Sequence, residues 1–356
     1  MKQSTTQGWF ELPDELAAGE PPEARGIERD EVRLLVASRA VMQHVRFRNL
    51  GDFLAAGDVL VVNTSATLPA AVDGRRAGSS VVVHFSAPVG NGLWMIELRS
   101  DDGSRALLDA APGEVVDLAA GAGAEVVATS GIEGRNRVVT ASISVEGTVE
   151  DYLAHAGRPI AYPYVARRWP LATYQTVFAT EPGSAEMPSA GRPFSTELVT
   201  SLIARGVVIV PVVLHTGVSS LERGEPPLPE RVRVPPATAR AVNSARAAGS
   251  RVVAVGTSVA RALETAADGA GSVTAVAGWT DLVLGPGRPA RIIDGLITGW
   301  HTPDASHQLL LQAVAGRELV HRAYRAALQE RYLWHEFGDA CLFLRDAADL
   351  KLLRVS

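Results

Sequence analysis

Polar side chains capable of chemistry follow two apolar runs of this sequence. His215 comes directly after the run that ends at Leu214, and Gly256-Thr257-Ser258 follows the run that ends at Val255. Parallel sheets bind ligands at the carboxyl ends of their strands, so these positions are the first candidates for a site. A histidine can exchange a proton near neutral pH. Hydroxyls at a helix start can cap the helix or bind a carboxylate or hydroxyl group of a ligand.

Each of these candidates also has a structural interpretation. Hydroxyls after a strand often only cap the next helix, and a lone histidine at a strand end is more often structural than catalytic. Asp294 and Glu264 could cap turns or pair with an arginine such as Arg261. His301 lies in a loop bounded by glycine and proline, where packing explains it less well. Trp279 and Trp300 could stack on a base, but burial is the expected role of each.

The segment from Tyr174 to Gly191 is too irregular to be core packing alone. Pro182-Gly183 and Pro188 interrupt it, and glycine again ends it. Proline fixes φ and glycine frees it, which suits an ordered loop that brings backbone close to a ligand. We therefore expect this segment to line a binding site.

Apolar runs outside the middle of the chain predict an α/β domain. Residues 33–36, 58–62, 207–214 and 251–255 are typical of buried strands, and residues 196–205, 236–248 and 318–332 are typical of helices. The alternation of the two favours a mainly parallel sheet with helices on its faces. Pro211 is unusual for a central strand.

The character of the sequence changes between residues 73 and 149. Short β-branched runs are separated there by glycine-rich turns at regular spacing. This pattern predicts a small antiparallel β-barrel domain. The α/β domain would then be built from both chain ends, residues 1–72 and 150–356, with the barrel inserted between them.

Composition is that of a globular protein, with 47% hydrophobic and 21% charged residues. A net charge of −5 supplies no general basic field of the kind that marks many nucleic-acid-binding proteins. The longest apolar run, residues 207–214, is too short to span a bilayer. A single cysteine, Cys341, and the absence of a signal pattern at the N-terminus favour a cytoplasmic location.

Common cofactor motifs are not found. His301 and His307 lack further metal ligands at suitable spacing, so no metal site is expected. The glycines at 121–123 follow no buried parallel strand and do not match a dinucleotide-binding fingerprint. A glycine-rich phosphate loop with lysine is also absent, so ATP hydrolysis is not expected.

Several blocks of residues nevertheless occur in a distinctive order. They are residues 174–194, residues 252–264, Gly278-Trp279-Thr280-Asp281, residues 294–298 with His301, and Tyr332 with Gly338-Asp339-Ala340. Their order and spacing resemble the S-adenosylmethionine:tRNA ribosyltransferase-isomerase family of queuosine biosynthesis. The resemblance extends from about Leu34 to Leu342, and the family fold agrees with the domain organisation predicted above.

The resemblance implies an enzyme that uses S-adenosylmethionine as a donor of ribose. The sulfonium acidifies the ribose 5′ carbon, a base removes a proton, and adenine leaves. The aminomethyl group of a deazaguanine base in tRNA captures the sugar, and rearrangement expels methionine to give epoxyqueuosine. S-adenosylmethionine is then a co-substrate with no further cofactor, tRNA is the partner, and neither a membrane nor a metal takes part.

Matching positions imply a set of site residues. The catalytic candidates are His215, Asp294 and His301. Those implied to bind the donor are Tyr174, Gln175, Thr176, Ala190, Gly191, Gly256, Thr257, Arg261 and Glu264. Among these, Arg261 and Glu264 are expected to form a charged pair that shapes the pocket.

The chain also departs from the family pattern. The family's Asn-Asp-Thr-Arg-Val-Ile-Pro-Ala-Arg is replaced at residues 63–71, which lose an aspartate and two arginines. A family histidine is replaced in Arg192-Pro193, and a lysine is replaced by Asp304. Lost cations weaken a phosphate-binding surface. Two alternatives thus stay open: an enzyme that passes the sugar to a small-molecule amine or water, and a non-enzymatic sensor, against which the retained His215, Asp294 and His301 argue.

Overall fold

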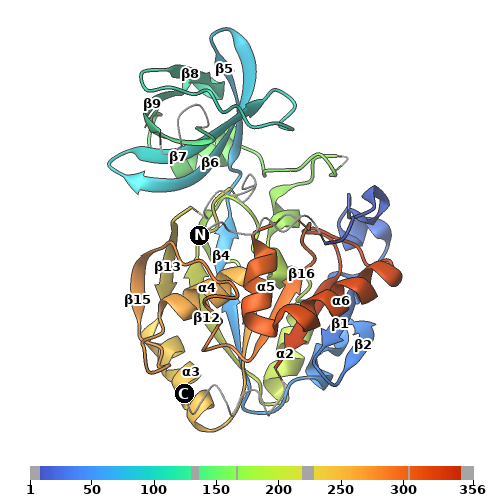
Figure 1. Ribbon diagram of the computed structural model, residues 1–356. Coiled ribbons are helices and arrows are strands. Elements are labelled where there is room, and N and C mark those ends of the chain that lie inside the picture. Colours follow the sequence, from blue (N-terminus) through green and yellow to red (C-terminus); the bar gives the residue numbers. More distant parts are fainter. Residues whose placement is uncertain (1–8, 130–135, 166, 219–227, 304, 346–356) are drawn as a thin grey trace.

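The structure, a computed structural model, describes residues 9–129, 136–165, 167–218, 228–303 and 305–345. Over these residues the chain forms a nine-stranded sheet covered by helices and a separate closed barrel of six antiparallel strands (Figure 1). The predicted combination of an α/β domain with an antiparallel β-barrel is confirmed. The same ranges contain no helix that could traverse a lipid bilayer.

The large sheet is parallel at its centre and antiparallel toward its edges. The central strands β12 (Val208–Leu214), β3 (Val59–Asn63), β14 (Val252–Val255) and β16 (Gly295–Gly299) are parallel neighbours. Antiparallel pairs extend the sheet through β13 (Glu230–Val234) to β15 (Val276–Thr280), and from β16 to β17 (Ala340–Leu344). The last strands are β1 (Arg33–Ala37), parallel to β17, and β2 (Met42–Arg46). Both chain ends therefore build one mixed sheet.

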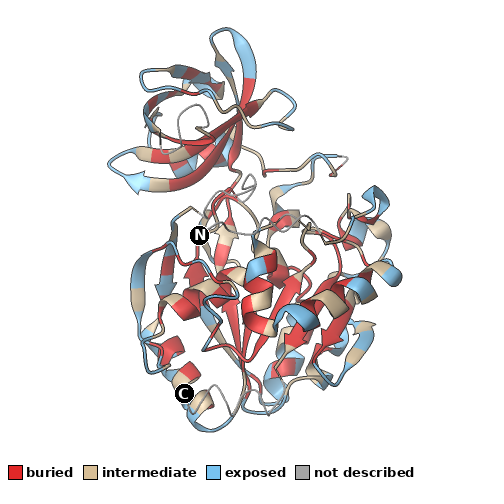
Figure 2. Ribbon diagram, in the orientation of Figure 1, coloured by how far each residue is buried: buried red, intermediate tan, exposed pale blue. Residues whose placement is uncertain are grey.

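Alternate residues of the central strands pack on opposite faces of this sheet. Leu60 and Val62 of β3 join a core with α2 (Thr196–Ala204). Val59 and Val61 point to the other face, which is covered by α3 (Pro236–Ala247), α4 (Thr257–Thr265), α5 (His307–Ala315) and α6 (Arg317–Gln329). Burial on both faces requires apolar side chains at successive positions, which explains the unbroken apolar runs (Figure 2).

Pro211 is accommodated because one edge of β12 is only partly paired. Its neighbour β13 pairs with β12 at Val213 and Leu214, whereas β3 pairs along the preceding residues. The side chain of Pro211 is exposed. A proline therefore costs little at this position, as it does in edge strands.

The barrel closes in the order β10-β7-β6-β5-β8-β9. These strands are β5 (Ala71–Arg76), β6 (Ser79–Gly90), β7 (Leu93–Ser100), β8 (Val115–Leu118), β9 (Gly123–Thr129) and β10 (Val138–Ser144). Its core also includes residues from outside the barrel, namely α1 (Val149–Ala156), Ile160 and Val218. The chain segments next to the barrel are thereby packed against it.

Shorter elements link these two bodies. Beyond the end of β3, strand β4 (Ser65–Thr67) pairs in parallel with β11 (Glu181–Ser184), which belongs to the irregular segment noted in the sequence. This pairing fixes the segment at the carboxyl end of β3. The 3-10 helices are η1 (Asp14–Leu16), η2 (Pro22–Arg25), η3 (Arg29–Glu31), η4 (Phe47–Asp52), η5 (Ala119–Gly121), η6 (Leu171–Tyr174) and η7 (Ser189–Gly191).

Candidate active site

A cavity of about 500 Å³ lies at the carboxyl ends of the central parallel strands. Residues 256–258 after β14, residues 298–302 at the end of β16 and residues 216–218 after β12 line it. The segment that leaves α1 contributes Tyr162 and Tyr164. The volume is within the range of small-molecule sites, and the position is where open α/β sheets bind ligands.

The first turn of α4 forms one wall of this cavity. Gly256 occupies the N-cap position with φ +96°, and its backbone N–H donates to the Ile297 oxygen over 2.8 Å. A Cβ at this position would lie 3.3 Å from the Cβ of Ala190, so glycine suits both the dihedral angle and the space. Thr257 and Ser258 line the cavity, and no side chain caps the helix. The capping interpretation therefore does not explain these hydroxyls.

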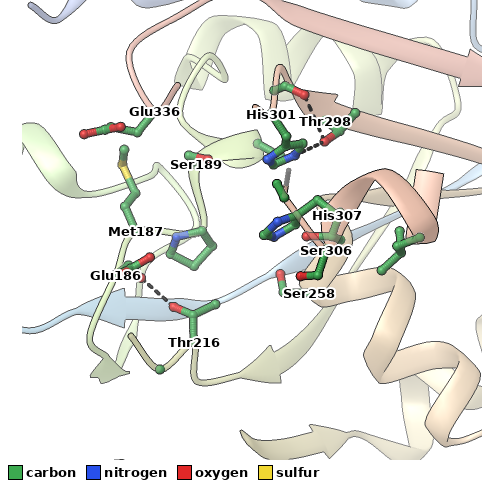
Figure 3. A pocket seen from close by; sticks show the side chains of 18 of the residues that line it. Glu186, Met187, Ser189, Thr216, Ser258, Thr298, His301, Ser306, His307 and Glu336 are labelled. Atoms are coloured by element: carbon green, nitrogen blue, oxygen red, sulfur yellow. Dashed lines mark hydrogen bonds between the residues drawn. The ribbon is translucent and has the colours of Figure 1, made fainter. Parts of the chain in front are cut away.

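Two stacked imidazoles lie in the middle of the cavity wall (Figure 3). The ring centroids of His301 and His307 are 4.2 Å apart, and the ring planes are nearly parallel, with an interplanar angle of 2°. His301 Nε2 lies 3.1 Å from the Thr298 hydroxyl oxygen. Burial lowers the pKa of His301 well below its ordinary value and that of His307 to about 4. Both imidazoles are therefore neutral at pH 7, and His301 is able to accept a proton.

Glu186 and Glu336 lie across the cavity from Ser258 (Figure 3), and Tyr162 and Tyr164 line the same cavity. The Tyr164 hydroxyl donates to Glu336 Oε2 over 2.5 Å, and the Tyr162 hydroxyl donates to Glu186. Burial raises the pKa of Glu336 to about 7, and the carboxylate of Glu186 adds to the effect.

Three buried donors on cavity-lining residues have no hydrogen-bond partner among the described residues. They are the Tyr174 hydroxyl, Arg261 Nη2 and Trp300 Nε1. An unpaired buried donor costs about 1–3 kcal/mol. A ligand with polar groups that reached these atoms would supply the missing partners.

Several residues implied by the family resemblance meet in this cavity. Those that line it are Tyr174, Ala190, Gly256, Thr257, Arg261 and His301. Gln175 lies behind the lining, where its side-chain amide both donates to and accepts from the backbone of Thr67, over 2.8 and 3.0 Å. Thr176 and Gly191 are in contact, because a Cβ on Gly191 would lie 3.2 Å from Thr176 Cγ2. These three residues position the loop rather than face the cavity.

His215 lies in a second, smaller cavity of about 210 Å³. Its Nδ1 is 2.8 Å from the Ser65 hydroxyl oxygen and its Nε2 is 3.7 Å from Glu181 Oε1. Burial lowers the pKa of His215. Gly183 permits this placement, since a Cβ there would lie 2.3 Å from the imidazole Nδ1. The two histidines implied to be catalytic, His215 and His301, are thus not brought together in one cavity.

The two tryptophans differ in exposure. Trp300 is 1% exposed, so its expected burial is confirmed. Trp279 is 45% exposed and lines the second cavity beside His215, so its expected burial is wrong. The cause is its position on β15, at the edge of the sheet, where one face of the strand has no covering layer.

Asp294 lies just before β16, at the end of the strand opposite to His301. Its Oδ2 accepts a hydrogen bond of 2.9 Å from the backbone N–H of Val252, the first residue of β14. The length of β16 separates Asp294 from the cavity by roughly 13 Å. The carboxylate therefore fixes the start of two parallel strands.

The charged pair expected between Arg261 and Glu264 is wrong. Arg261 forms its ion pair with Glu230 of β13, and both side chains are largely buried. Glu264 instead accepts hydrogen bonds of 2.8 Å from the backbone N–H groups of residues 291 and 292. The two side chains are three residues apart on α4, and tertiary partners compete successfully with this local pairing.

Some lining residues had no signal in the sequence. Glu186, Glu336, Tyr162 and Tyr164 occur in irregular segments, where no periodic pattern indicates which way a side chain points. His307 was named only with His301 as a pair lacking further metal ligands, and its six-residue spacing from His301 did not indicate that the two rings stack. Among the described residues, no group of three or more His, Cys, Asp or Glu side chains could hold a metal ion.

Comparison with known proteins agrees with this architecture. A family model described as "Queuosine biosynthesis protein" matches residues 6–343. The chain belongs to this family. Asp304, one of its departures from the family pattern, lies outside the described residues. Another, Arg192, pairs with Glu23 over 2.8 Å and donates to the Thr173 oxygen, so it serves packing beside the loop.

Similar members of the family span almost the same length. An S-adenosylmethionine:tRNA ribosyltransferase-isomerase of Heliobacterium modesticaldum is 37% identical over 94% of this chain and 98% of its own length. One of a Thermoanaerobacter species is 33% identical over 97% of this chain and its full length. The crystal structure of S-adenosylmethionine tRNA ribosyltransferase from Thermotoga maritima matches with a TM-score of 0.53 and 28% identity, covering 94% of this chain and 99% of that one.

Proposed function

We propose that this protein transfers and isomerises the ribosyl moiety of S-adenosylmethionine onto the aminomethyl-deazaguanine base of tRNA. The products are epoxyqueuosine in tRNA, adenine and methionine. Family membership supports the reaction. One observation assigns the reaction to particular residues. The neutral imidazole of His301 and the start of α4 line the same cavity.

His301 is the proposed proton acceptor. A base must remove a proton from the ribose 5′ carbon beside the sulfonium, and a neutral imidazole can do so at pH 7. His301 is buried and neutral there, and the Thr298 hydroxyl lies 3.1 Å from its Nε2. His215 remains the second candidate, from the smaller cavity, and Asp294 is proposed to act only by fixing the strands.

The donor is proposed to bind along the first turn of α4. The hydroxyls of Thr257 and Ser258 offer hydrogen bonds to its polar groups, and Gly256 lets the donor approach the helix start closely. Arg261 Nη2 and Trp300 Nε1 supply further donors, suited to the methionine carboxylate and to ribose oxygens. S-adenosylmethionine is the co-substrate in this proposal, and no further cofactor is required.

Enclosure of the cavity would protect the reactive intermediates. Ile160 and Val218 line the cavity and at the same time belong to the core of the barrel. The barrel thus closes one side of the site with apolar surface and limits hydrolysis of the ribosyl intermediate. A cytoplasmic location follows for the protein if tRNA is its partner.

Release of adenine tests this function. Purified protein is incubated with S-adenosylmethionine, with and without tRNA that carries the aminomethyl-deazaguanine base, and adenine is measured by chromatography. We expect adenine and a modified tRNA only when that tRNA is present. Release without tRNA would indicate another acceptor, and no release under either condition would exclude the proposed reaction.

Substitution of the proposed base sharpens the test. His301→Gln should lower kcat by about 100-fold or more, the usual contribution of a general base. His155→Gln is the matched control, because His155 is exposed on α1. If His301→Gln and the control turn over at the same rate, His301 is not the proton acceptor.

A further inference from the structure

Strands β13 and β15 leave one face of the large sheet uncovered, at the left edge of Figure 1. Val232 and Val234 of β13 pack in the core with α3 and α4, so Arg231 and Arg233 project from the opposite face. The core on that side, which includes α2, contains no described residue of β13 or β15. Much of this edge is exposed in Figure 2. The face is therefore open to a partner.

Two arginines and a tryptophan lie together on this face. In the antiparallel register Arg231 is directly opposite Trp279, and Arg233 is directly opposite Ala277. Side chains that are directly opposite in such a pair project from the same face and are neighbours. Both arginines and Trp279 are exposed, and all three line the smaller cavity that contains His215. These three residues are called the Arg–Trp surface below.

One cation of the Arg–Trp surface has no counter-ion. Arg233 forms an ion pair with Glu181, so its charge is offset. The side chain of Arg231 forms no ion pair or hydrogen bond with any residue that the structure describes. A free guanidinium beside an exposed indole matches the two parts of a nucleotide, because guanidinium groups bind phosphate and aromatic rings stack on bases.

The Arg–Trp surface adjoins the larger cavity. His215 and Thr216 are consecutive, yet His215 lines the smaller cavity and Thr216 lines the larger one. Glu230 and Arg231, at the start of β13, divide between the larger and the smaller cavity in the same way. A polymer with one unit in the larger cavity can therefore place its next unit on the Arg–Trp surface.

We propose that the Arg–Trp surface binds a single-stranded nucleotide next to the acceptor base of tRNA, with the Trp279 indole stacked on its base and Arg231 on its phosphate. This rests on the proposed function, in which tRNA carries the acceptor. A base that enters the larger cavity leaves its stack, so its neighbour loses a stacking partner, which the indole replaces. Because the whole chain has a net charge of −5, an unpaired local cation matters for RNA affinity.

A second copy of this chain is the other candidate for this face, because β15 is an edge strand. An isologous dimer across the face would place the same cations of two copies near each other, which is unfavourable. The phosphates of RNA supply the opposite charge. Charge complementarity therefore favours RNA over a second copy.

The affinity of variants for tRNA tests the proposal. The probe is tRNA that carries the aminomethyl-deazaguanine base, and its Kd is measured by fluorescence anisotropy. Trp279→Ala should raise Kd about 5- to 100-fold, the usual contribution of one stacked aromatic residue, and Trp279→Phe should restore most of the affinity. Arg231→Gln should reduce the slope of log K against log salt concentration by about 0.7, the contribution of one single-strand phosphate.

Kinetics separate this role from a general structural one. In Trp279→Ala the KM for tRNA should rise with Kd, while kcat at saturating tRNA and the KM for S-adenosylmethionine stay within twofold. Ile203→Ala and Arg240→Gln are the matched controls, because these residues are exposed on α2 and α3. Circular dichroism confirms that each variant is folded.

Unchanged tRNA affinity in Trp279→Ala would overturn the proposal. An equal loss of affinity for a blunt RNA duplex would also overturn it, because the bases of a duplex are already stacked. A wild-type dimer that Trp279→Ala dissociates, with tRNA affinity unchanged, would assign the face to a second copy instead. Failure of the proposed function gives a different result: the wild type releases no adenine with tRNA, although tRNA binding still depends on Trp279.

Discussion

The imidazole of His301 lies flat against that of His307, with 4.2 Å between the ring centroids. Protonation of either ring would place a charge beside a buried neighbour, and each pKa is lowered by burial. The pair therefore stays neutral well below pH 6.5. His301 Nε2 also lies 3.1 Å from the Thr298 hydroxyl oxygen of β16, which orients this imidazole at the end of the strand.

Removal of His307 should change how stability depends on pH. In the unfolded chain His307 has its ordinary pKa near 6.5, whereas in the folded protein its pKa is about 4. Between these values the unfolded state binds more protons, so the folded state loses stability as pH falls, by up to about 1.4 kcal/mol per pH unit. His307→Leu should reduce this loss, as measured by urea unfolding from pH 7 to pH 4.5. The control is His155→Gln, and an unchanged pH dependence in His307→Leu would contradict the expectation.

Gly256→Ala should weaken donor binding and destabilise the protein. The residue has φ +96°, and an added Cβ would meet Ala190 at 3.3 Å. With ψ at 156°, this backbone lies in a region used almost only by glycine, and it costs a residue with a Cβ about 1–3 kcal/mol. Calorimetry with S-adenosylmethionine and thermal unfolding measure both effects. Gly269→Ala is the control, since a Cβ at Gly269 meets no atom within 4 Å. Equal behaviour of the two variants would show that Gly256 is not constrained.

Asp294→Ala separates a structural from a catalytic role. Loss of the hydrogen bond to the Val252 N–H should lower the free energy of unfolding by about 1–3 kcal/mol. The kcat per folded molecule should stay within twofold, because the carboxylate lies at the far end of β16. Denaturant titration and adenine release are measured on the same preparation. A large fall in kcat without loss of stability would restore Asp294 as a catalytic candidate.

Glu97→Gln should destabilise the barrel. Glu97 is 1% exposed and lies 3.0 Å from Arg99 and 2.9 Å from Arg137. Burial alone would raise its pKa, but the hydrogen bond with His84 and the two guanidinium charges lower it to about 2. Removing one member of a buried ion pair costs about 3–5 kcal/mol. Urea unfolding measures the loss, with Glu125→Gln, an exposed position on β9, as the control.

The lowered pKa of Glu97 also predicts how the stability of the protein decreases at acidic pH. A lowered pKa in the folded state stabilises the protein above pH 4.5, and this contribution is lost as pH falls from 4.5 toward 2. Glu97→Gln should therefore show a smaller loss of stability in that range than the wild type. If the wild type and Glu97→Gln lose stability equally between pH 4.5 and pH 2, Glu97 is not the cause of the acid destabilisation.

Local patterns in the sequence determined the elements and the organisation of this protein. Apolar runs such as residues 59–63 indicated strands buried on both faces, and regular glycine turns indicated the barrel. The ordered motifs identified the family. These features can be predicted from the sequence because the burial of one face of a strand and the formation of a turn depend on residues only a few positions apart.

Only the tertiary structure decided which side chains meet. Tyr164 and Glu336 are 172 residues apart in the chain yet share a hydrogen bond, and Arg261 pairs with Glu230 rather than with Glu264. His215 follows a strand as His301 does, but it lies in a different cavity. Such contacts depend on the order of strands in the sheet and on how the barrel packs against it, and neither leaves a periodic signal in the residues concerned.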